Sequence, residues 1–401
     1  MEFGPMGPIG EGGSLLLRVN RNCPWNGCLF CPVYKGHRFS PRSSEEIKTD
    51  IDCAHRVWDI LDKSSWAMGL GGRISDAVLK EVVKDRPEIF GTDDHAYTSD
   101  HAAAFHTLRN VALWVHSGAS RVFLQDADAL AMKPGELAGI LEHLKQRFPT
   151  IDTVSTYARS KTCARRSVKE LSALKECGLG ECLVGMESGS DAVLSFMHKG
   201  VSASETVEAL IKLGEAGIKA AAFVMPGLGG RNRELADHMD QTLKVLNAGK
   251  PSEVRVRSLA VIEGTPLSNL MQAGAFIHPL EEQMIEEIGR LIEGLSLECE
   301  FETLQMTNTL FTYKGSLPRD RQALLKAILD FQALPGHEKA AILLDRCVTG
   351  GYLDFIRSWG LYDDMIEQAI EAADGSIRTG DPDALDKTNE ALRLIKSKGI
   401  P

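Results

Sequence analysis

The chain of 401 residues lacks any run of 18 apolar residues, so its sequence offers no candidate for a membrane-spanning helix. The first residues, MEFGPMGPIGEGGS, are rich in glycine and proline and do not have the pattern of a secretory signal peptide. The chain also lacks a dense run of lysine and arginine, and its 45 basic and 55 acidic residues give a formal net charge of −10. A broad nucleic-acid-binding surface is therefore not expected, although a small patch touching an RNA loop is compatible with this composition.

The cysteines do not suggest a disulfide framework, because there are nine of them, an odd number, in a long chain. Such a cysteine content fits a reducing compartment, and together with the missing membrane segment it predicts a cytoplasmic protein. The chain is 43% hydrophobic, which is ample for one large core or two domains.

Three of the cysteines, Cys23, Cys28 and Cys31, lie close together in the segment RNCPWNGCLFCPVYKG, directly after the short apolar run 14–19. Three neighbouring thiolates can hold one iron–sulfur cluster and leave one iron without a protein ligand. An open iron favours chemistry over electron transfer or structure. The alternative is a structural zinc site with His37 as the fourth ligand, although the second half of a usual zinc pattern is missing.

Between residues 119 and 267 the sequence alternates strand-like and helix-like segments, which predicts a parallel sheet with right-handed crossovers. Capping boxes at Ser167/Glu170 and Ser202/Glu205 mark two of the helix starts. Six strands are too few for a closed eight-stranded barrel, so an open or partial barrel is expected. The predicted strands are 14–20, 121–127, 153–158, 181–187, 219–225 and 253–262.

Two mostly helical regions are added to this α/β core. An insertion over about 43–118 begins at a Ser43/Glu46 capping box and either covers the barrel's mouth or flank or is an elaborated crossover without a role at the site. After residue 275 the strand signals fade and helical stripes follow. The sequence thus predicts a core over 1–275 and a C-terminal helical subdomain over 276–401.

Functional groups in parallel α/β folds gather at the carboxyl ends of the strands. Five of the predicted strand ends carry cysteine, polar or glycine-rich segments, which makes this edge of the sheet the expected site. The segments are the cysteine loop, Gln125–Asp128, Ser155–Arg159, Glu187–Ser190 and Pro226–Gly230.

The cysteine motif, VGMESGSD (184–191) and GLGG (227–230) together resemble the radical S-adenosylmethionine (radical-SAM) superfamily. The resemblance covers about residues 14–267 and is greatest to the branch with oxygen-independent coproporphyrinogen oxidases and methylthiotransferases. That family's usual spacing is C-x3-C-x2-C, whereas the first interval here is one residue longer; Phe30 is the aromatic that often precedes the third cysteine. The resemblance implies a partial (β/α)6 TIM-type barrel, a [4Fe–4S] cluster on Cys23, Cys28 and Cys31, and bound S-adenosyl-L-methionine.

The chemical groups of S-adenosylmethionine suggest roles for the strand-end residues. A carboxylate such as Glu187 or Asp126 can accept from its amino group or ribose, and Arg159 can pair with its carboxylate. Plainer alternatives are a rim salt bridge for Glu187, an acid partner for Arg159 and a simple turn for GLGG. Gly71-Gly72 resembles the start of the family's amino-group motif, but Arg73 stands where the acid belongs, so QDAD (125–128) is preferred. The predicted cofactor-binding residues are Phe30, Gln125, Asp126, Asp128, Arg159, Glu187, Ser188, Gly227, Gly229 and Gly230.

The resemblance implies an enzyme, an oxidoreductase or transferase, that reductively cleaves S-adenosylmethionine at the cluster. The product, a 5′-deoxyadenosyl radical, would abstract hydrogen from an unidentified substrate. The expected partners are a small-molecule substrate and an electron donor such as flavodoxin or ferredoxin, with no membrane and no nucleic acid. The alternatives are a methyltransferase that uses a second S-adenosylmethionine, a non-catalytic iron–sulfur or zinc protein, and an RNA-modifying enzyme, which the net charge disfavours.

Overall fold

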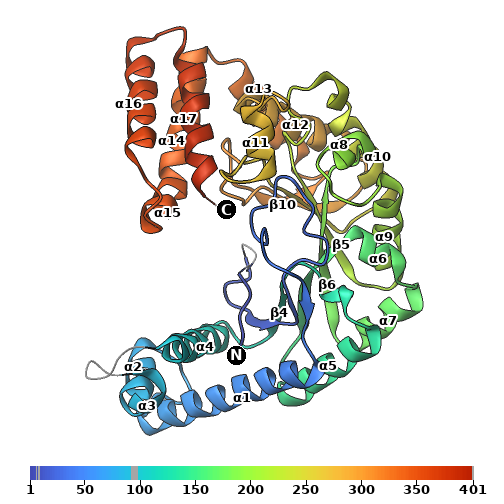
Figure 1. The fold of residues 1–401 in the computed structure, drawn as a ribbon, viewed down its shortest axis with the longest axis vertical. Coiled ribbons are helices and arrows are strands. Elements are labelled where there is room, and N and C mark those ends of the chain that lie inside the picture. The colour runs from blue at the N-terminus through green and yellow to red at the C-terminus, as the bar shows by residue number, and fades with distance from the viewer. Residues whose placement is uncertain (6, 8–9, 92–97, 400–401) are drawn as a thin grey trace. The chain divides into compact units, whose positions relative to one another are not determined.

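The structure, a computed structural model, describes residues 1–5, 7, 10–91 and 98–399 (Figure 1). The chain forms two compact units, each made of several chain segments. The first unit comprises Met1–Pro24, Gly36–Leu183 and Glu215–Lys219, and the second comprises Trp25–Lys35, Val184–Gly214 and Ala220–Pro401.

The first unit contains a parallel sheet whose strand order is β1 (Leu15–Arg18), β4 (Arg121–Gln125), β5 (Thr153–Arg159) and β6 (Leu179–Glu187), the last of which continues into the second unit. β1 pairs with β4 and β4 with β5 in parallel register. A separate antiparallel pair, β2 (Asn20–Arg21) and β3 (Ser40–Pro41), follows β1. β4 is buried over Val122–Gln125, as expected for a parallel strand covered on both faces.

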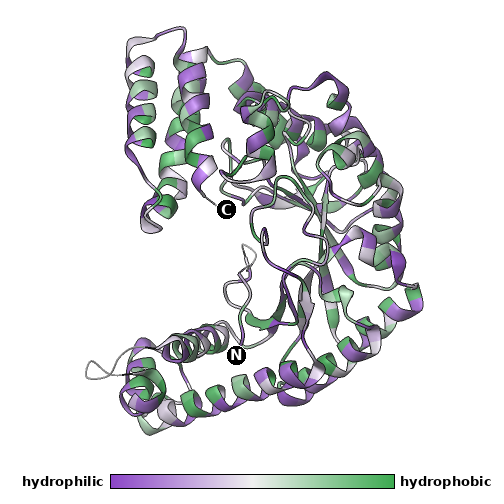
Figure 2. Cartoon of the chain, in the orientation of Figure 1, coloured by the Kyte–Doolittle hydropathy of each residue, from purple (hydrophilic) through white to green (hydrophobic). Residues whose placement is uncertain are grey.

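Helices of the first unit begin where the sequence predicts them. The capping boxes at Ser43 and Ser167 are both formed, with each serine accepting from the backbone three residues on. Hydrophobic and hydrophilic residues alternate along the long helix α1 (Figure 2), so one of its faces can pack on the unit. The helices are α1 (Ser44–Ala67), α2 (Asp76–Lys84), α3 (Pro87–Phe90), α4 (Ser99–His116), α5 (Pro134–Arg147), α6 (Ser160–Arg165) and α7 (Val168–Glu176), with a 3₁₀ turn at Ala129–Ala131.

The insertion covers the edge of the sheet in this unit. β1 is the first strand of the order, and its outer edge faces the buried side chain of Asn110 in α4. Asn110 Oδ1 accepts from the Leu16 N–H at 3.1 Å, and Asn110 Nδ2 donates to the Ser14 carbonyl at 3.2 Å. One amide side chain thus satisfies backbone groups that a neighbouring strand would otherwise bind.

In the second unit the sheet continues from β6 through β7 (Lys219–Val224), β8 (Glu253–Val256), β9 (Cys299–Glu302) and β10 (Lys314–Leu317). β7, β8 and β9 are parallel, and β10 is antiparallel to β9. The predicted α/β class with a mostly parallel sheet is confirmed, and all six predicted strands are present.

Two expectations about strands are wrong. The last predicted strand, 253–262, ends at Val256, because residues 257–262 continue as buried irregular chain. Strands also continue after residue 275, since β9 and β10 lie in the region predicted to be wholly helical. Both are only four residues long, and β9 (CEFE) contains two glutamates, so propensity gives little signal there. The division into a 1–275 core and a 276–401 subdomain stays a prediction.

The helices of the second unit include the predicted start at Ser202, where Glu205 completes the capping box. In the C-terminal part, Leu344, Ala373 and Ala391 form the core between α14, α16 and α17, which lie side by side (Figure 1). The helices are α8 (Asp191–Phe196), α9 (Ala203–Glu215), α10 (His238–Gly249), α11 (Pro266–Gln272), α12 (Glu281–Gly294), α13 (Arg321–Gln332), α14 (Gly336–Thr349), α15 (Tyr352–Ser358), α16 (Asp364–Thr379) and α17 (Ala384–Lys398). Among the described residues, no helix combines the length and hydrophobicity needed to cross a bilayer.

A buried ion pair ties the last helix to α12 within the second unit. Lys396 Nζ lies 2.6 and 2.8 Å from the two carboxylate oxygens of Glu281 and 2.9 Å from the Thr307 carbonyl. Thr309 Oγ1 also donates to Glu281, at 2.7 Å. Lys396 is 1% exposed and Glu281 is 3% exposed, so each buried charge is stabilised by the opposite charge of its partner.

Candidate cofactor site

The three-cysteine loop passes from one unit to the other. Cys23 belongs to the first unit, Cys28 and Cys31 belong to the second, and all three are half-buried. Within the part of the chain that the structure describes, no three His, Cys, Asp or Glu side chains are grouped to hold a single metal ion. The donor chemistry fits a [4Fe–4S] cluster, in which separate thiolates bind separate irons. Cluster binding by these three cysteines stays a prediction.

In the first unit Asp126 fixes the backbone beside Cys23. Its carboxylate accepts from Arg18 Nε at 2.7 Å and from the Asn22 N–H at 3.0 Å, and its side chain is fully buried. Both Asp126 (φ 72°) and Asn22 (φ 70°) adopt the left-handed backbone region, which is uncommon for residues other than glycine. Such conformations persist where the surroundings enforce them, often at functional sites.

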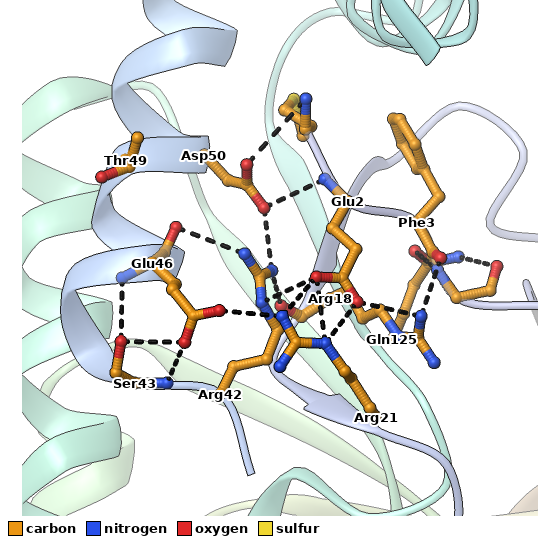
Figure 3. A network of polar contacts seen from close by, with 12 residues as sticks. Glu2, Phe3, Arg18, Arg21, Arg42, Ser43, Glu46, Thr49, Asp50 and Gln125 are labelled. Carbon is orange, nitrogen blue, oxygen red and sulfur yellow. Dashed lines mark hydrogen bonds and ion pairs between the residues drawn. The ribbon is translucent and has the colours of Figure 1, made fainter. Parts of the chain in front are cut away.

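Arg18, which pairs with Asp126, also belongs to a polar network around Glu2, which Figure 3 shows. The Glu2 carboxylate contacts Arg18 at 3.0 Å, Arg21 at 2.7 Å and Arg42 at 3.4 Å. Gln125 Oε1 accepts from the Gly4 N–H at 2.9 Å. Gln125 and Asp126, two of the predicted cofactor residues, are therefore bonded to other parts of the first unit, and their role as ligands stays a prediction.

Asp128 and Arg159, predicted from different strand ends, are brought together. Asp128 Oδ2 accepts from Thr162 Oγ1 at 2.5 Å, while its Oδ1 has no hydrogen-bond partner among the described residues. Burial raises the pKa of Asp128 to about 6, despite the opposing effects of the Thr162 hydroxyl and of the charge and backbone N–H of Arg159. This carboxylate faces the interior of the first unit.

We expect Asp128→Asn to change how stability depends on pH. Because the folded-state pKa of Asp128 is about 6 and its ordinary value is 3.8, the folded chain binds the proton more tightly. The free energy of unfolding should therefore fall as pH rises through this window, by roughly 1.4 kcal/mol per pKa unit. Between pH 4 and 7, the free energy of unfolding measured with urea should fall less in Asp128→Asn than in the wild type. Thr162→Val should extend the fall to higher pH, and an identical slope in wild type and Asp128→Asn would contradict the assignment.

In the second unit the cysteine loop is bonded to the segment after α8. The Leu29 N–H donates to the Met197 carbonyl at 3.0 Å, and the Leu29 carbonyl accepts from the Leu267 N–H at 3.0 Å. Phe30 packs against the buried apolar cluster that contains Met197 and Leu267. These contacts fix the backbone between Cys28 and Cys31 through main-chain groups.

Glu187, at the end of β6, pairs with a lysine that the sequence analysis does not single out. Lys199 Nζ lies 3.0 Å from Glu187 Oε1 and 5.9 Å from the centroid of the Phe30 ring. Glu187 has a left-handed backbone (φ 65°), as Asp126 has in the other unit. In the sequence, the segment MHKG around Lys199 indicates only the end of a helix. It gives no sign that Lys199 lies beside Glu187 and Phe30, two predicted cofactor residues.

The neighbouring residue, Ser188, points into the protein. Its Oγ lies 2.8 Å from His238 Nδ1, and His238 Nε2 lies 3.0 Å from the Met225 carbonyl. Because the carbonyl only accepts, Nε2 carries a proton, and this orients the ring with Nδ1 toward the serine hydroxyl. The Met225 N–H in turn donates to the Glu187 carbonyl at 2.9 Å, so the ends of β6 and β7 are neighbours, as predicted.

The glycines of GLGG are packed against other residues. A Cβ on Gly227 would lie 2.8 Å from Met284 Sδ, one on Gly229 2.8 Å from the Leu235 carbonyl, and one on Gly230 2.6 Å from the Ile277 carbonyl. The Gly227 N–H donates to Glu287 at 2.6 Å. Close packing therefore explains these glycines, and their contact with a cofactor stays a prediction.

Comparisons with known proteins find short or distant similarities. No family model matches the chain. A stretch of 122 residues is 29% identical to the tRNA uridine(34) acetyltransferase of Methanocaldococcus infernus, covering 30% of this chain and 23% of that protein. A stretch of 120 residues is 28% identical to the protein of the same name from Methanocaldococcus jannaschii, covering 30% and 22%. The matched region thus spans less than a quarter of these relatives.

Among solved structures, the coproporphyrinogen III oxidase of Escherichia coli, described as a radical SAM enzyme, is similar over 71% of this chain and 52% of that chain. The sequence identity is 13% and the TM-score is 0.42. At this TM-score the similarity does not by itself establish a shared fold.

Proposed function

We propose that this protein is a radical-SAM enzyme acting on a small molecule. The observation that carries the proposal is the second unit's cysteine loop, in which Phe30, between Cys28 and Cys31 in the sequence, lies 5.9 Å from Lys199 of the Glu187–Lys199 pair. Thiols, an aromatic face and two opposite charges at the ends of parallel strands are the groups that such a cofactor pair requires.

The chain's own residues would bind and orient the cofactor. Lys199 can pair with the carboxylate of S-adenosylmethionine, and Glu187 can accept from its amino group. In the protein alone these two side chains pair with each other. Phe30 offers a ring face for the adenine. When bound, the reduced cluster supplies the electron that cleaves the sulfonium C–S bond and yields a 5′-deoxyadenosyl radical.

The test is anaerobic reconstitution with iron and sulfide, followed by assay for 5′-deoxyadenosine. We expect about four irons per chain, as in a [4Fe–4S] cluster, and formation of 5′-deoxyadenosine under a strong reductant. Zinc in place of iron, or a cluster that does not cleave the cofactor, would favour a non-catalytic metalloprotein. S-Adenosylhomocysteine among the products would favour the methyltransferase.

We expect Glu187→Ala to weaken binding of S-adenosylmethionine by roughly 1–3 kcal/mol, the scale of a lost hydrogen bond to a charged group. Lys199 would keep its charge without its 3.0 Å partner, so the cofactor's carboxylate could still bind. Anaerobic calorimetry on the reconstituted protein measures the effect. Glu208→Ala, which removes an exposed carboxylate paired with Lys212 in the same unit, is the control. Unchanged affinity in Glu187→Ala would reject its role.

The proposed reaction also implies partners. An electron donor such as flavodoxin or ferredoxin is required by the chemistry, and a small substrate fits the absence of a basic run. The two tRNA-modifying relatives raise RNA as the competing substrate, over a stretch that covers 30% of this chain. Deuterium transfer into 5′-deoxyadenosine from deuterated cell extract, with and without ribonuclease treatment, separates the two classes.

A further inference from the structure

The cysteine motif contains one more residue than its usual form, and the second unit shows how that residue is accommodated. Four residues, Pro24 to Gly27, separate Cys23 from Cys28. Asn26 takes a left-handed backbone (φ 48°), its Nδ2 donates to the Tyr34 carbonyl at 2.5 Å, and its carbonyl accepts from Lys35 Nζ at 2.8 Å. The longer interval thus contains a bend at Pro24 and Trp25 followed by a left-handed residue.

The side chain of Trp25 lies on the segment that follows α8. The indole Nε1–H of Trp25 donates to the His198 carbonyl at 2.7 Å. The ring lies against Gly200, where an added Cβ would overlap it, and against Gly27, where a Cβ would lie 2.7 Å from Nε1. Gly200 also has φ +69°, so glycine is favoured there both by conformation and by the indole.

The residues on both sides of Cys28 are held by contacts. On one side is Gly27, packed on the indole; on the other is Leu29, whose N–H is bonded to Met197. His198 and Gly200 contact Trp25 before Cys28, and Met197 binds Leu29 directly after it. Mutation of a group that orients a metal ligand typically costs about 10- to 100-fold in metal affinity or activity.

We propose that Trp25 is a positioning residue for Cys28, seated on Gly200 and bonded to the His198 carbonyl. This inference rests on the proposed cluster at Cys23, Cys28 and Cys31. It assigns a purpose to the longer first interval of the motif: the added residue lets the loop bind to the segment after α8 through an indole.

The test compares Gly200→Ala with Gly274→Ala in the full-length, reconstituted protein. Gly274 has a similar left-handed backbone (φ +72°), but open space surrounds the position of its Cβ. Both variants therefore share the conformational cost, and only Gly200→Ala displaces the indole. We expect Gly200→Ala to lose iron to a chelator about 10- to 100-fold faster, the usual scale for a lost outer support of a metal ligand. The Gly274→Ala rate should match wild type.

A double-mutant cycle with Trp25→Ala identifies the route of the effect. If Gly200→Ala acts by displacing the indole, it should not increase the rate of iron loss further when Trp25 is already alanine. The electron paramagnetic resonance change on adding S-adenosylmethionine should be altered in both single variants and intermediate in Trp25→Phe, which keeps a ring without the N–H donor.

The outcomes separate the two levels of the proposal. Absence of iron and sulfide in the wild type would overturn the cluster itself. A normal wild-type cluster with equal iron loss in Gly200→Ala and Gly274→Ala, or with additive losses in the cycle, would overturn the positioning role alone. Should Gly200→Ala fail to fold by circular dichroism, wild-type iron retention in both Trp25→Phe and Trp25→Ala would overturn it instead.

Discussion

Cys28→Ala should reduce the cleavage of S-adenosylmethionine to background while leaving the chain folded. The thiol is half-buried in a loop whose neighbouring residue, Leu29, is held by main-chain hydrogen bonds that do not involve the cysteine side chain. Loss of one of only three thiolate ligands should leave a second iron without a protein ligand and make the cluster labile. Iron content and 5′-deoxyadenosine formation after anaerobic reconstitution are the measurements.

Cys53→Ala provides the matched control, because Cys53 is also half-buried but lies in helix α1, far along the chain from the motif. It should keep both iron and activity. Full cleavage activity in Cys28→Ala would remove this cysteine from the ligand set and with it the main support for the proposed function.

The second large effect is expected at the buried pair of the C-terminal region. Lys396→Met should lower the free energy of unfolding by roughly 3–5 kcal/mol, because it leaves the Glu281 carboxylate buried without its counter-charge. The change should appear as a lower midpoint in urea unfolding, followed by far-ultraviolet circular dichroism.

Two further variants test the cause of this loss. Lys387→Met removes another lysine of α17, but its ion pair with Asp381 is partly exposed to solvent, so the effect should stay below about 1 kcal/mol. Lys396→Met combined with Glu281→Leu removes both charges and should recover most of the stability. Equal losses in the single and double variants would mean that packing, not the unpaired charge, dominates.

Much of the fold could be predicted because its signals are local. Serine–glutamate capping boxes located helix starts at Ser43, Ser167 and Ser202, and buried runs such as VFLQ in β4 located strands. The strands β9 and β10 escaped prediction because four-residue segments with charged side chains acquire strand structure from pairing with β8 and with each other.

The candidate site could be predicted only where the residue type and its position in the sequence indicate the chemistry. Three cysteines in one loop and acids at strand ends are visible in the sequence. Lys199, His238 and Trp25 are not, because their roles depend on contacts with Glu187, Ser188 and Gly200 that form only on folding. Conversely, the glycines of GLGG look like an approach to a ligand, yet the space beside each is filled by neighbouring residues.

The amide of Asn110 has a consequence for the order in which the first unit is completed. Residues 99–125 supply both neighbours of β1: α4 binds one edge through Asn110, and β4 pairs with the other. During synthesis the Leu16 and Ser14 backbone groups emerge 94 and 96 residues before their partner Asn110, and β4 follows later still. An unpaired strand next to three thiols is open both to aggregation and to premature oxidation. The insertion thus delays the time at which β1 of the nascent chain is covered. Residues 99–125 then cover both edges of β1 together.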